Sequence, residues 1–329
     1  MKIYVLASGG GHTGYAVAIG EALVDLEPEI DLSFILPPDD IWSLRRLKYR
    51  FVDFDPVFVV KPRKPLEGIG KALLLGPRAL FDSLRFVKEP FMVIATGSNH
   101  GLIPIVTGLF RRARFLFSIE AIDRVYTCSK ANMIMYRKFR TTMLLHWKEQ
   151  KKNYSRGVVV GPIYEKPIYR VRDDGYILVL SGSMGHRKLF DLLLKTDLEN
   201  VVVQTGKIDP DYIVSKKPHW KAFMFDPDID RWIAGASVVI GHQGLSIAEA
   251  ALAYGKPVII AYNPDLPQTS GRLDSLLLAR KLNGIYIDVE KTSPQELVEA
   301  INRAKKKQPP KYINGAYVLA RTIIGMLYK

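Results

Sequence analysis

Short apolar runs alternate with stretches of helical periodicity along the whole chain. This alternation is typical of βαβ units, in which each strand is followed by a helix and the strands form a parallel sheet. A first set of strands is expected at residues 3–7, 31–36, 57–60, 91–95, 114–118, 124–128 and 143–146. A second set is expected at residues 176–180, 200–204, 221–225, 237–240, 257–261 and 284–288. The pattern therefore predicts an α/β protein with two parallel sheets.

The two sets are separated by proline and glycine residues. Gly161-Pro162 and Lys166-Pro167 interrupt the pattern and mark a boundary. We expect a first Rossmann-like domain at residues 1–157 and a second one at residues 158–310, facing one cleft. The last segment, residues 311–329, is expected to form a helix that packs back on the first domain.

One uncharged stretch, residues 91–110, has about the length of a membrane span. Polar residues at 96–100 and a proline at 104 interrupt it, so we expect a strand, a polar loop and the start of a helix instead. The first residues already belong to a predicted strand and show no charged region before an apolar region, so no signal peptide is expected.

Glycine-rich loops follow the first strand of each set. They read Ser8-Gly9-Gly10-Gly11-His12-Thr13-Gly14 and Ser181-Gly182-Ser183-Met184-Gly185. A third turn of this kind, residues 242–246, follows the strand expected at residues 237–240. Each turn gathers main-chain N–H groups at the positive end of a helix dipole, which suits phosphate. A nucleotide diphosphate is therefore expected between the two turns of the second half.

The composition narrows the classes of protein and of partner. The 329 residues are 48% hydrophobic and 24% charged, which is enough for two cores and excludes fibrous and disordered proteins. The net charge of +14 indicates acidic partners. Aromatic residues are not interleaved with the charge in an RNA-binding pattern, so we expect no nucleic acid. A single cysteine and six scattered histidines provide neither a disulfide framework nor metal-ligand spacing, and a reducing, cytoplasmic compartment is expected. Because no acidic cluster is visible that could hold a cation, metal independence is also expected.

The first loop also matches the G-x-G-x-x-G spacing of dinucleotide-binding proteins through Gly9, Gly11 and Gly14. Such proteins carry an acidic residue about twenty positions further on, at the end of the second strand. Here Asp31 opens that strand instead of closing it. An NAD(P)-dependent oxidoreductase therefore stays the alternative that depends on this loop alone.

Four motifs of the first half resemble a known family. The loop at Gly10 to Gly14 is similar to the Gly-Gly-His-Thr-Gly loop of the acceptor-side subunit of the eukaryotic transferase that adds the second GlcNAc to dolichol-diphosphate-GlcNAc. Residues 96–101 resemble that family's Gly-Pro-Gly loop, and residues 120–125 with Ser129 resemble its Glu-Ser-Phe-x-Arg-Val segment. His146-Trp147 stands at the position of its Gln-Trp pair.

The second half resembles the donor-side subunit of the same enzyme and the single-chain MurG-type transferases. Residues 241–246 and 255–259 look like the sugar-nucleotide half of GT-B glycosyltransferases. The resemblance implies a fused enzyme with the GT-B fold. One position departs from the family, because the ribose-binding Glu is replaced by Ala250 and Glu249 stands one residue earlier, about 100° round a helix.

The resemblance implies an inverting transfer of GlcNAc from UDP-GlcNAc to a polyprenyl-diphosphate-linked sugar, without a cofactor. Another UDP-sugar, or a soluble or glycolipid acceptor, stays open. His12 and Glu120 are the candidates for the base, and we expect both to be needed. A lone His in such a loop could instead bind the diphosphate of the acceptor, and a lone Glu could be a structural helix cap. The residues expected to bind the acceptor are Gly10, Gly11, Thr13, Ser98, Asn99 and Arg124. Those expected to bind the donor are Ser181, Gly182, Ser183, Gly185, Phe225, His242, Gly244, Ser246, Glu249, Asn263 and Gln268.

A lipid-linked acceptor would account for a basic amphipathic stretch. Between Trp42 and Pro90 there are eleven Lys or Arg residues and five acidic residues, interleaved with leucines and phenylalanines. Such a stretch would lie on an anionic membrane surface, although a charged helix that covers the domain's own core has the same pattern. Because no membrane anchor is visible, we expect peripheral attachment to the inner face of the cell membrane.

Overall fold

The computed structural model describes residues 1–63, 67–266 and 270–328. The chain divides into two compact units, each built on one parallel sheet. Unit 1 consists of Met1–Ile122, Cys128–Glu165 and Ile313–Lys329. Unit 2 consists of Asp123–Thr127 and Lys166–Tyr312. The predicted fold class, α/β with two parallel sheets, is confirmed.

The sheet of unit 1 has seven strands in the order β3-β2-β1-β4-β5-β6-β7. Its strands are β1 (Lys2–Leu6), β2 (Leu32–Leu36), β3 (Asp55–Phe58), β4 (Pro90–Ala95), β5 (Phe115–Ile119), β6 (Thr142–Leu145) and β7 (Val158–Val159). The central strands are almost wholly buried, as expected for a parallel sheet that is covered on both faces. The order reverses between β1 and β4, so the loops that leave these two strands open side by side.

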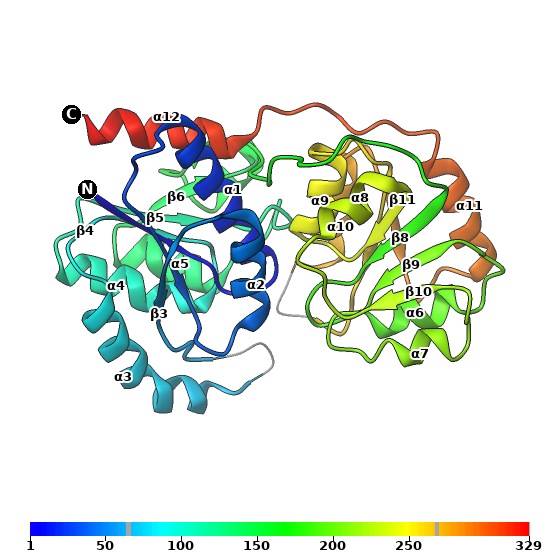
Figure 1. Ribbon diagram of the computed structural model, residues 1–329, viewed down its shortest axis with the longest axis horizontal. Helices are drawn as coiled ribbons and strands as arrows, with labels where there is room; N and C mark the ends of the chain where they lie inside the picture. The colour runs from blue at the N-terminus through cyan, green and yellow to red at the C-terminus, as the bar shows by residue number, and fades with distance from the viewer. Residues whose placement is uncertain (64–66, 267–269, 329) are drawn as a thin grey trace. The chain divides into compact units, whose positions relative to one another are not determined.

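Helices cover both faces of this sheet (Figure 1). They are α1 (Gly11–Leu26), α2 (Ile41–Arg50), α3 (Ile69–Phe86), α4 (Leu102–Phe110), α5 (Lys130–Lys138) and α12 (Gly315–Leu327), with the short 3₁₀ helices η1 (Asn99–Gly101) and η2 (Lys148–Lys152). The C-terminal helix α12 packs against α1. Tyr317 donates to Asp25 at 2.6 Å and Tyr328 donates to Glu27 at 2.7 Å, so both ends of α12 are attached to unit 1.

The sheet of unit 2 has six strands in the order β10-β9-β8-β11-β12-β13. Its strands are β8 (Tyr176–Leu180), β9 (Val201–Gln204), β10 (Lys221–Phe223), β11 (Ala236–Gly241), β12 (Val258–Tyr262) and β13 (Ile285–Asp288). Its helices are α6 (Arg187–Leu193), α7 (Asp211–Val214), α8 (Ile229–Gly235), α9 (Leu245–Leu252), α10 (Arg272–Lys281) and α11 (Pro294–Ala304). Here the strand order reverses between β8 and β11.

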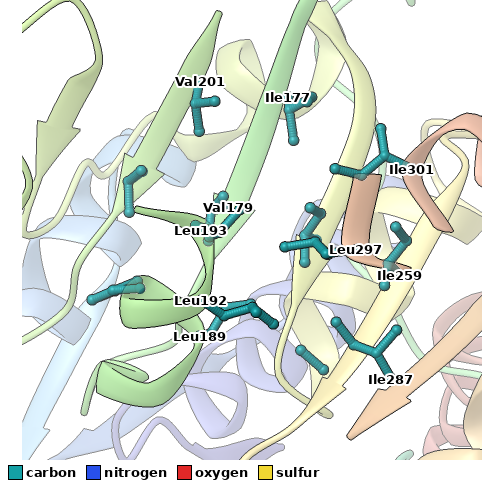
Figure 2. Close-up of a cluster of buried hydrophobic side chains, with 14 of the residues drawn as sticks. Ile177, Val179, Leu189, Leu192, Leu193, Val201, Ile259, Ile287, Leu297 and Ile301 are labelled. Carbon is teal, nitrogen blue, oxygen red and sulfur yellow. The ribbon is translucent and has the colours of Figure 1, made fainter. Parts of the chain in front are cut away.

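A buried apolar cluster of unit 2 lies between the sheet and helices α6, α7 and α11, and Figure 2 shows part of it. Leu189 and Leu193 of α6 and Leu297 of α11 are fully buried against strand residues such as Ile259. Helix α11 begins with a capping box, in which the Ser293 side chain accepts from the Glu296 amide and the Glu296 carboxylate accepts from the Ser293 amide. The apolar spacing and the cap together explain why this helix forms where it does.

One predicted strand, residues 124–128, is wrong. The segment Asp123–Thr127 forms turns and belongs to unit 2. The main-chain N–H groups of Tyr126 and Thr127 donate to the buried Asp274 carboxylate at 2.6 and 3.1 Å, which takes them out of any sheet ladder. The strand β7 was not predicted, because two residues are too few to show an alternation of apolar and polar positions.

The uncharged stretch at residues 91–110 forms β4, η1 and α4, as expected. Among the helices of the described residues, none combines the length and the apolar character needed to cross a bilayer.

Candidate functional site

In unit 1 the loops after β1 and β4 meet at the carboxyl edge of the sheet, where the strand order reverses. The imidazole of His12, in the first turn of α1, lies against Gly97 of the second loop. His100 Nδ1 and Ser8 Oγ form a second contact between the loops at 3.2 Å. The structure therefore brings together residues 8–14 and 96–101, which the sequence placed about ninety positions apart. Ligands of open α/β sheets bind in this type of crevice.

Most main-chain N–H groups of the first loop are used within the loop. The Gly9 amide donates to the hydroxyls of Thr13 and Ser43, both at 3.1 Å, and those two hydroxyls lie 2.6 Å apart. The amides of residues 12–14 donate to the carbonyls of Gly9 and Gly10. Gly9 and Gly10 have φ values of 87° and 53°, which glycine adopts without strain. Thr13, expected to bind the acceptor, therefore shapes the loop.

The hydrogen bond of His12 determines which ring nitrogen holds the proton. Its Nδ1 lies 2.5 Å from the carbonyl oxygen of Thr96. A carbonyl only accepts, so the neutral imidazole carries its proton on Nδ1 and its lone pair on Nε2. His12 is half-buried, and in its neutral form Nε2 carries the lone pair that a general base needs.

Glu120, the other candidate base, is fully buried and strongly hydrogen-bonded. Its carboxylate accepts from the amides of Ala121 at 2.8 Å and Ser129 at 3.0 Å, and from the Tyr154 hydroxyl at 2.5 Å. These bonds close the loop between β5 and α5, whose N-cap is Ser129. This geometry agrees with the structural role that the sequence left open for Glu120.

The remaining residues of unit 1 differ in their surroundings. Asn99 Nδ2 donates to the Arg63 carbonyl at 3.1 Å. Ser98 is 7% exposed, and its hydroxyl has no hydrogen-bond partner among the described residues. His100 is 0% exposed; burial lowers its pKa to about 3, assisted by the charge of Lys61. Arg124, expected with the acceptor residues, lies in the segment that belongs to unit 2 and donates to the Thr127 hydroxyl.

In unit 2 the loops after β8 and β11 are in contact at the carboxyl edge of their sheet. Gly182 has a φ of 69°, and a side chain here would collide with the ring of His242. Gly185 and Gly244 also have positive φ values, of 83° and 155°. Gly244 precedes α9, whose first N–H groups open toward this edge. The two glycine-rich turns predicted for a diphosphate therefore lie side by side, and burial lowers the pKa of His242, so that its ring is uncharged.

Two residues expected to bind the donor use their side chains inside the loops. Ser181 is fully buried and donates to the Gln204 carbonyl at 2.5 Å. Asn263 donates to the Gly185 carbonyl at 3.2 Å and accepts from the Asp265 amide at 3.1 Å. Both residues thus fix the positions of the turns.

The other residues expected to bind the donor fall into three groups. Ser183 and Ser246 are half-exposed on the two turns. Glu249 is 3% exposed on α9, and Phe225 lies two residues beyond the end of β10. Gln268 lies outside the described residues.

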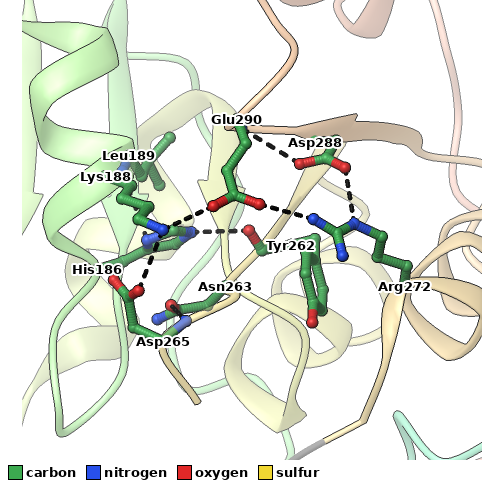
Figure 3. Close-up of polar contacts among 9 residues, drawn as sticks. All are labelled: His186, Lys188, Leu189, Tyr262, Asn263, Asp265, Arg272, Asp288 and Glu290. Atoms are coloured by element: carbon green, nitrogen blue, oxygen red, sulfur yellow. Dashed lines mark hydrogen bonds and ion pairs between the residues drawn. The ribbon is translucent and has the colours of Figure 1, made fainter. Parts of the chain in front are cut away.

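An ion-pair network that the sequence did not predict borders these turns (Figure 3). Lys188 pairs with Glu290 at 2.7 Å and with Asp265 at 3.3 Å, and Arg272 pairs with Asp288 at 2.8 Å. A hydrogen bond to Glu290 raises the pKa of Lys188. His186 Nε2 lies 3.2 Å from the Tyr262 carbonyl, and burial lowers the pKa of His186 to about 3. The network links the first turn of α6 to β13 and the β12–α10 loop. From the sequence, Lys188 could equally have been a solvated residue at a helix start, but the structure places it in this network.

The sequence of the second unit matches a known domain. Residues 176–316 match the model of the glycosyltransferase family 28 C-terminal domain, a range that includes both glycine-rich turns of unit 2. Comparison with the curated proteins finds no match.

Solved structures show the class of fold. The chain is similar to MurG of Acinetobacter baumannii, with a TM-score of 0.63 and 14% identity over 99% of this chain and 100% of that one. It is also similar to the glycosyltransferase SnogD of Streptomyces nogalater, with a TM-score of 0.60 and 15% identity over 99% and 100% of the two chains. The UDP-GlcNAc 2-epimerase of Neisseria meningitidis, solved with UDP-GlcNAc, has a TM-score of 0.63 and 11% identity over both whole chains. The GT-B fold predicted from the sequence is thus confirmed.

Proposed function

We propose that this protein is an inverting, UDP-sugar-dependent glycosyltransferase that moves GlcNAc from UDP-GlcNAc to a polyprenyl-diphosphate-linked sugar. The observation that carries the proposal is the pair of glycine-rich turns after β8 and β11, which lie side by side within the range that matches the glycosyltransferase family 28 domain. Main-chain N–H groups and the N-terminus of α9 would bind the diphosphate of the donor without a metal ion.

The transfer forms one bond and breaks one bond at the anomeric carbon of the donor sugar. An acceptor hydroxyl attacks this carbon as the bond to the β-phosphate oxygen of UDP breaks, which inverts the configuration. His12 Nε2 takes the hydroxyl proton, because its partner Thr96 holds the other ring proton on Nδ1. The charge that develops on UDP is stabilised by the amides of the turns and by the dipole of α9. Glu120 holds the β5–α5 loop in place and takes no proton in this scheme.

A membrane surface accounts for the exposed apolar residues of α3 and α4. Leu73, Leu74 and Phe81 are 76, 77 and 63% exposed, and Phe110 at the end of α4 is 70% exposed. The two helices pack together in unit 1. Basic residues occur in the same stretches of sequence, namely Lys71, Arg78, Arg85, Arg111 and Arg112. Apolar residues with a basic surround suit an anionic bilayer surface, and the proposed acceptor resides in one.

Ligand-dependent thermal unfolding tests the donor half of this proposal. UDP and UDP-GlcNAc should raise the Tm of the full chain, because a ligand that binds only the folded state stabilises it, and more so as its concentration rises above Kd. NAD, which does not bind in this account, should not raise the Tm. UDP-Glc is included to measure the preference for the sugar. A shift with NAD alone would favour the oxidoreductase and contradict the proposal.

A product assay separates transfer from epimerisation, since both chemistries occur on this fold. The transferase releases UDP only when a polyprenyl-diphosphate-GlcNAc acceptor is added. An epimerase would convert UDP-GlcNAc to its 2-epimer without an acceptor, and that result would contradict the proposal. His12→Ala should abolish the acceptor-dependent release while UDP binding persists.

Liposome flotation tests the membrane surface. The wild type should float with vesicles that contain phosphatidylglycerol, and the Leu73→Ser/Leu74→Ser double variant should remain largely in the soluble fraction. The control is Val52→Ser, a change at a fully exposed apolar residue outside α3 and α4. Equal flotation of all three proteins would contradict the assignment of this surface to membrane binding.

A further inference from the structure

The carboxyl edge of unit 1 includes a third segment, residues 59–63, which follows β3. Lys61 Nζ donates to the Ser8 carbonyl at 3.0 Å, directly before the glycine-rich loop. The Asn99 amide group donates to the Arg63 carbonyl at 3.1 Å. The segment is therefore attached to both loops of the site, to the first through the Lys61 side chain and to the second through the Arg63 main chain.

The side chain of Arg63 is an unusual feature of this segment. It is half-buried, and its Nε is shielded from solvent without a hydrogen-bond partner in the described part of the chain. A guanidinium N–H that is buried without an acceptor is costly. The Ser98 hydroxyl on the adjacent loop is likewise buried and without a partner among residues 1–63, 67–266 and 270–328. Two buried donors without acceptors among the described residues, on two segments joined by Asn99, are suited to an anionic ligand.

The main chain of the first loop supplies too few donors for a diphosphate. The amides of Gly9 and residues 12–14 are used inside the loop, while those of Gly10 and Gly11 donate to no other group in the described residues. His100 lies beside the loop but is neutral, because burial holds its pKa at about 3. The nearby carboxylate of Asp40 accepts from the Ser43 amide and hydroxyl, which makes it the cap of α2. Positive charge for an anion must therefore come from side chains outside the loop.

We propose that Arg63 and Lys61, together with Ser98 and the amides of Gly10 and Gly11, form the binding site for the diphosphate of the acceptor. This inference rests on the proposed function and adds to it the source of the positive charge. Arg63 is assigned the principal contact, because its planar fork can donate two hydrogen bonds to one phosphate group. Lys61 contributes charge and holds Ser8 in position. The loop amides orient the diphosphate, and the cations neutralise it.

Titration calorimetry of the full chain with inorganic pyrophosphate tests this site. The protein is first saturated with UDP, so that the turns of unit 2 are occupied. The wild type should then still bind pyrophosphate, and more tightly than inorganic phosphate. Arg63→Gln should weaken pyrophosphate binding by about tenfold or more, the usual effect of losing a charge-assisted hydrogen bond, and Arg63→Lys should recover part of it. Ser98→Ala should weaken binding severalfold.

The matched control is Lys48→Gln, which removes one positive charge from an exposed position of α2 in the same unit. It should change pyrophosphate affinity by less than about twofold, as expected for a screened surface charge. Equal weakening by Lys48→Gln and Arg63→Gln, at matched thermal stability, would overturn the site in favour of a general charge effect. Unchanged affinity in Arg63→Gln would overturn it directly.

The same titrations separate this inference from the proposed function. A wild type that binds pyrophosphate through Arg63 but does not bind UDP would contradict the proposed function and support the anion site. A wild type that binds UDP but no further pyrophosphate would contradict the anion site and support the proposed function. Competition with phosphatidylglycerol vesicles distinguishes a lipid headgroup as the anion: displacement of pyrophosphate by the vesicles would overturn the assignment to a diphosphate.

Discussion

Replacing Glu120 by Gln gives the sharpest separation between a structural and a catalytic role for this carboxylate. The carboxylate accepts three hydrogen bonds at a site that is 0% exposed. Hydrogen bonds to a buried charge contribute about 1.5 to 3 kcal/mol each. The Gln amide has one oxygen to accept and one NH₂ group that faces donors, so at least one of the three bonds becomes a donor–donor contact. We therefore expect a loss of about 2 to 4 kcal/mol in the free energy of unfolding, against the 5 to 15 kcal/mol that is typical of a domain.

The assay is urea unfolding followed by tryptophan fluorescence, combined with turnover measured well below the unfolding range. Trp147 is a suitable reporter, because its indole donates to the Ile122 carbonyl next to this loop. Tyr154→Phe removes one of the three donors and should cost less than Glu120→Gln. The double variant should cost less than the sum, since the two residues share a bond. A Glu120→Gln protein that unfolds like the wild type but has no turnover would refute this reasoning and make Glu120 the base.

Three further predictions concern other parts of the two units. Glu165 pairs with Arg46 and Arg50 of α2 in a cluster whose side chains are 1 to 7% exposed. Glu165→Gln should therefore lower the free energy of unfolding in urea by about 3 to 5 kcal/mol. A loss below about 1 kcal/mol would contradict the burial of this charge. Gly182→Ala should weaken UDP binding in calorimetry by tenfold or more, because the new methyl group forces the His242 ring away from the turn. It should also lower the stability by about 1 kcal/mol or more, because alanine is strained at a positive φ. Unchanged UDP affinity would contradict the assignment of this turn to the donor site. Acid should destabilise both units below pH 6.5, because the unfolded chain then binds protons that the folded histidines, with pKa values lowered to about 3, do not bind. The residues involved are His100, His146 and His186. The free energy of unfolding should be constant above pH 6.5, and below it should fall by up to about 1.4 kcal/mol per pH unit for each of these residues. Equal urea midpoints at pH 7 and pH 5 would contradict their buried neutral state.

The two sheets and the glycine-rich loops could be predicted because their signals are local. A strand, a glycine turn and a helix follow one another within about twenty residues, and the positive φ values of Gly9 and Gly182 occur where the spacing predicted tight turns. The strand predicted at residues 124–128 failed for a non-local reason, since Asp274 takes the amides that a ladder would need.

The contacts around the candidate site could not be predicted from the sequence. Thr13, Ser181 and Asn263 carry hydroxyl or amide groups in loops, and a sequence does not show whether such a group faces a ligand or a carbonyl of the next loop. Arg63 was missed for a related reason. It follows β3, at the edge of the sheet, and only the fold shows that its segment returns to the loops after β1 and β4.

The central claim is that main-chain amides of unit 2 bind the diphosphate of a UDP-sugar. Hydrogen exchange of backbone amides, measured with and without saturating UDP, tests it most directly. The account predicts slower exchange at residues 181–185 and 242–246, with little change at residues 9–14. Protection at residues 9–14 instead, with exchange at both turns of unit 2 unaffected by UDP, would contradict it.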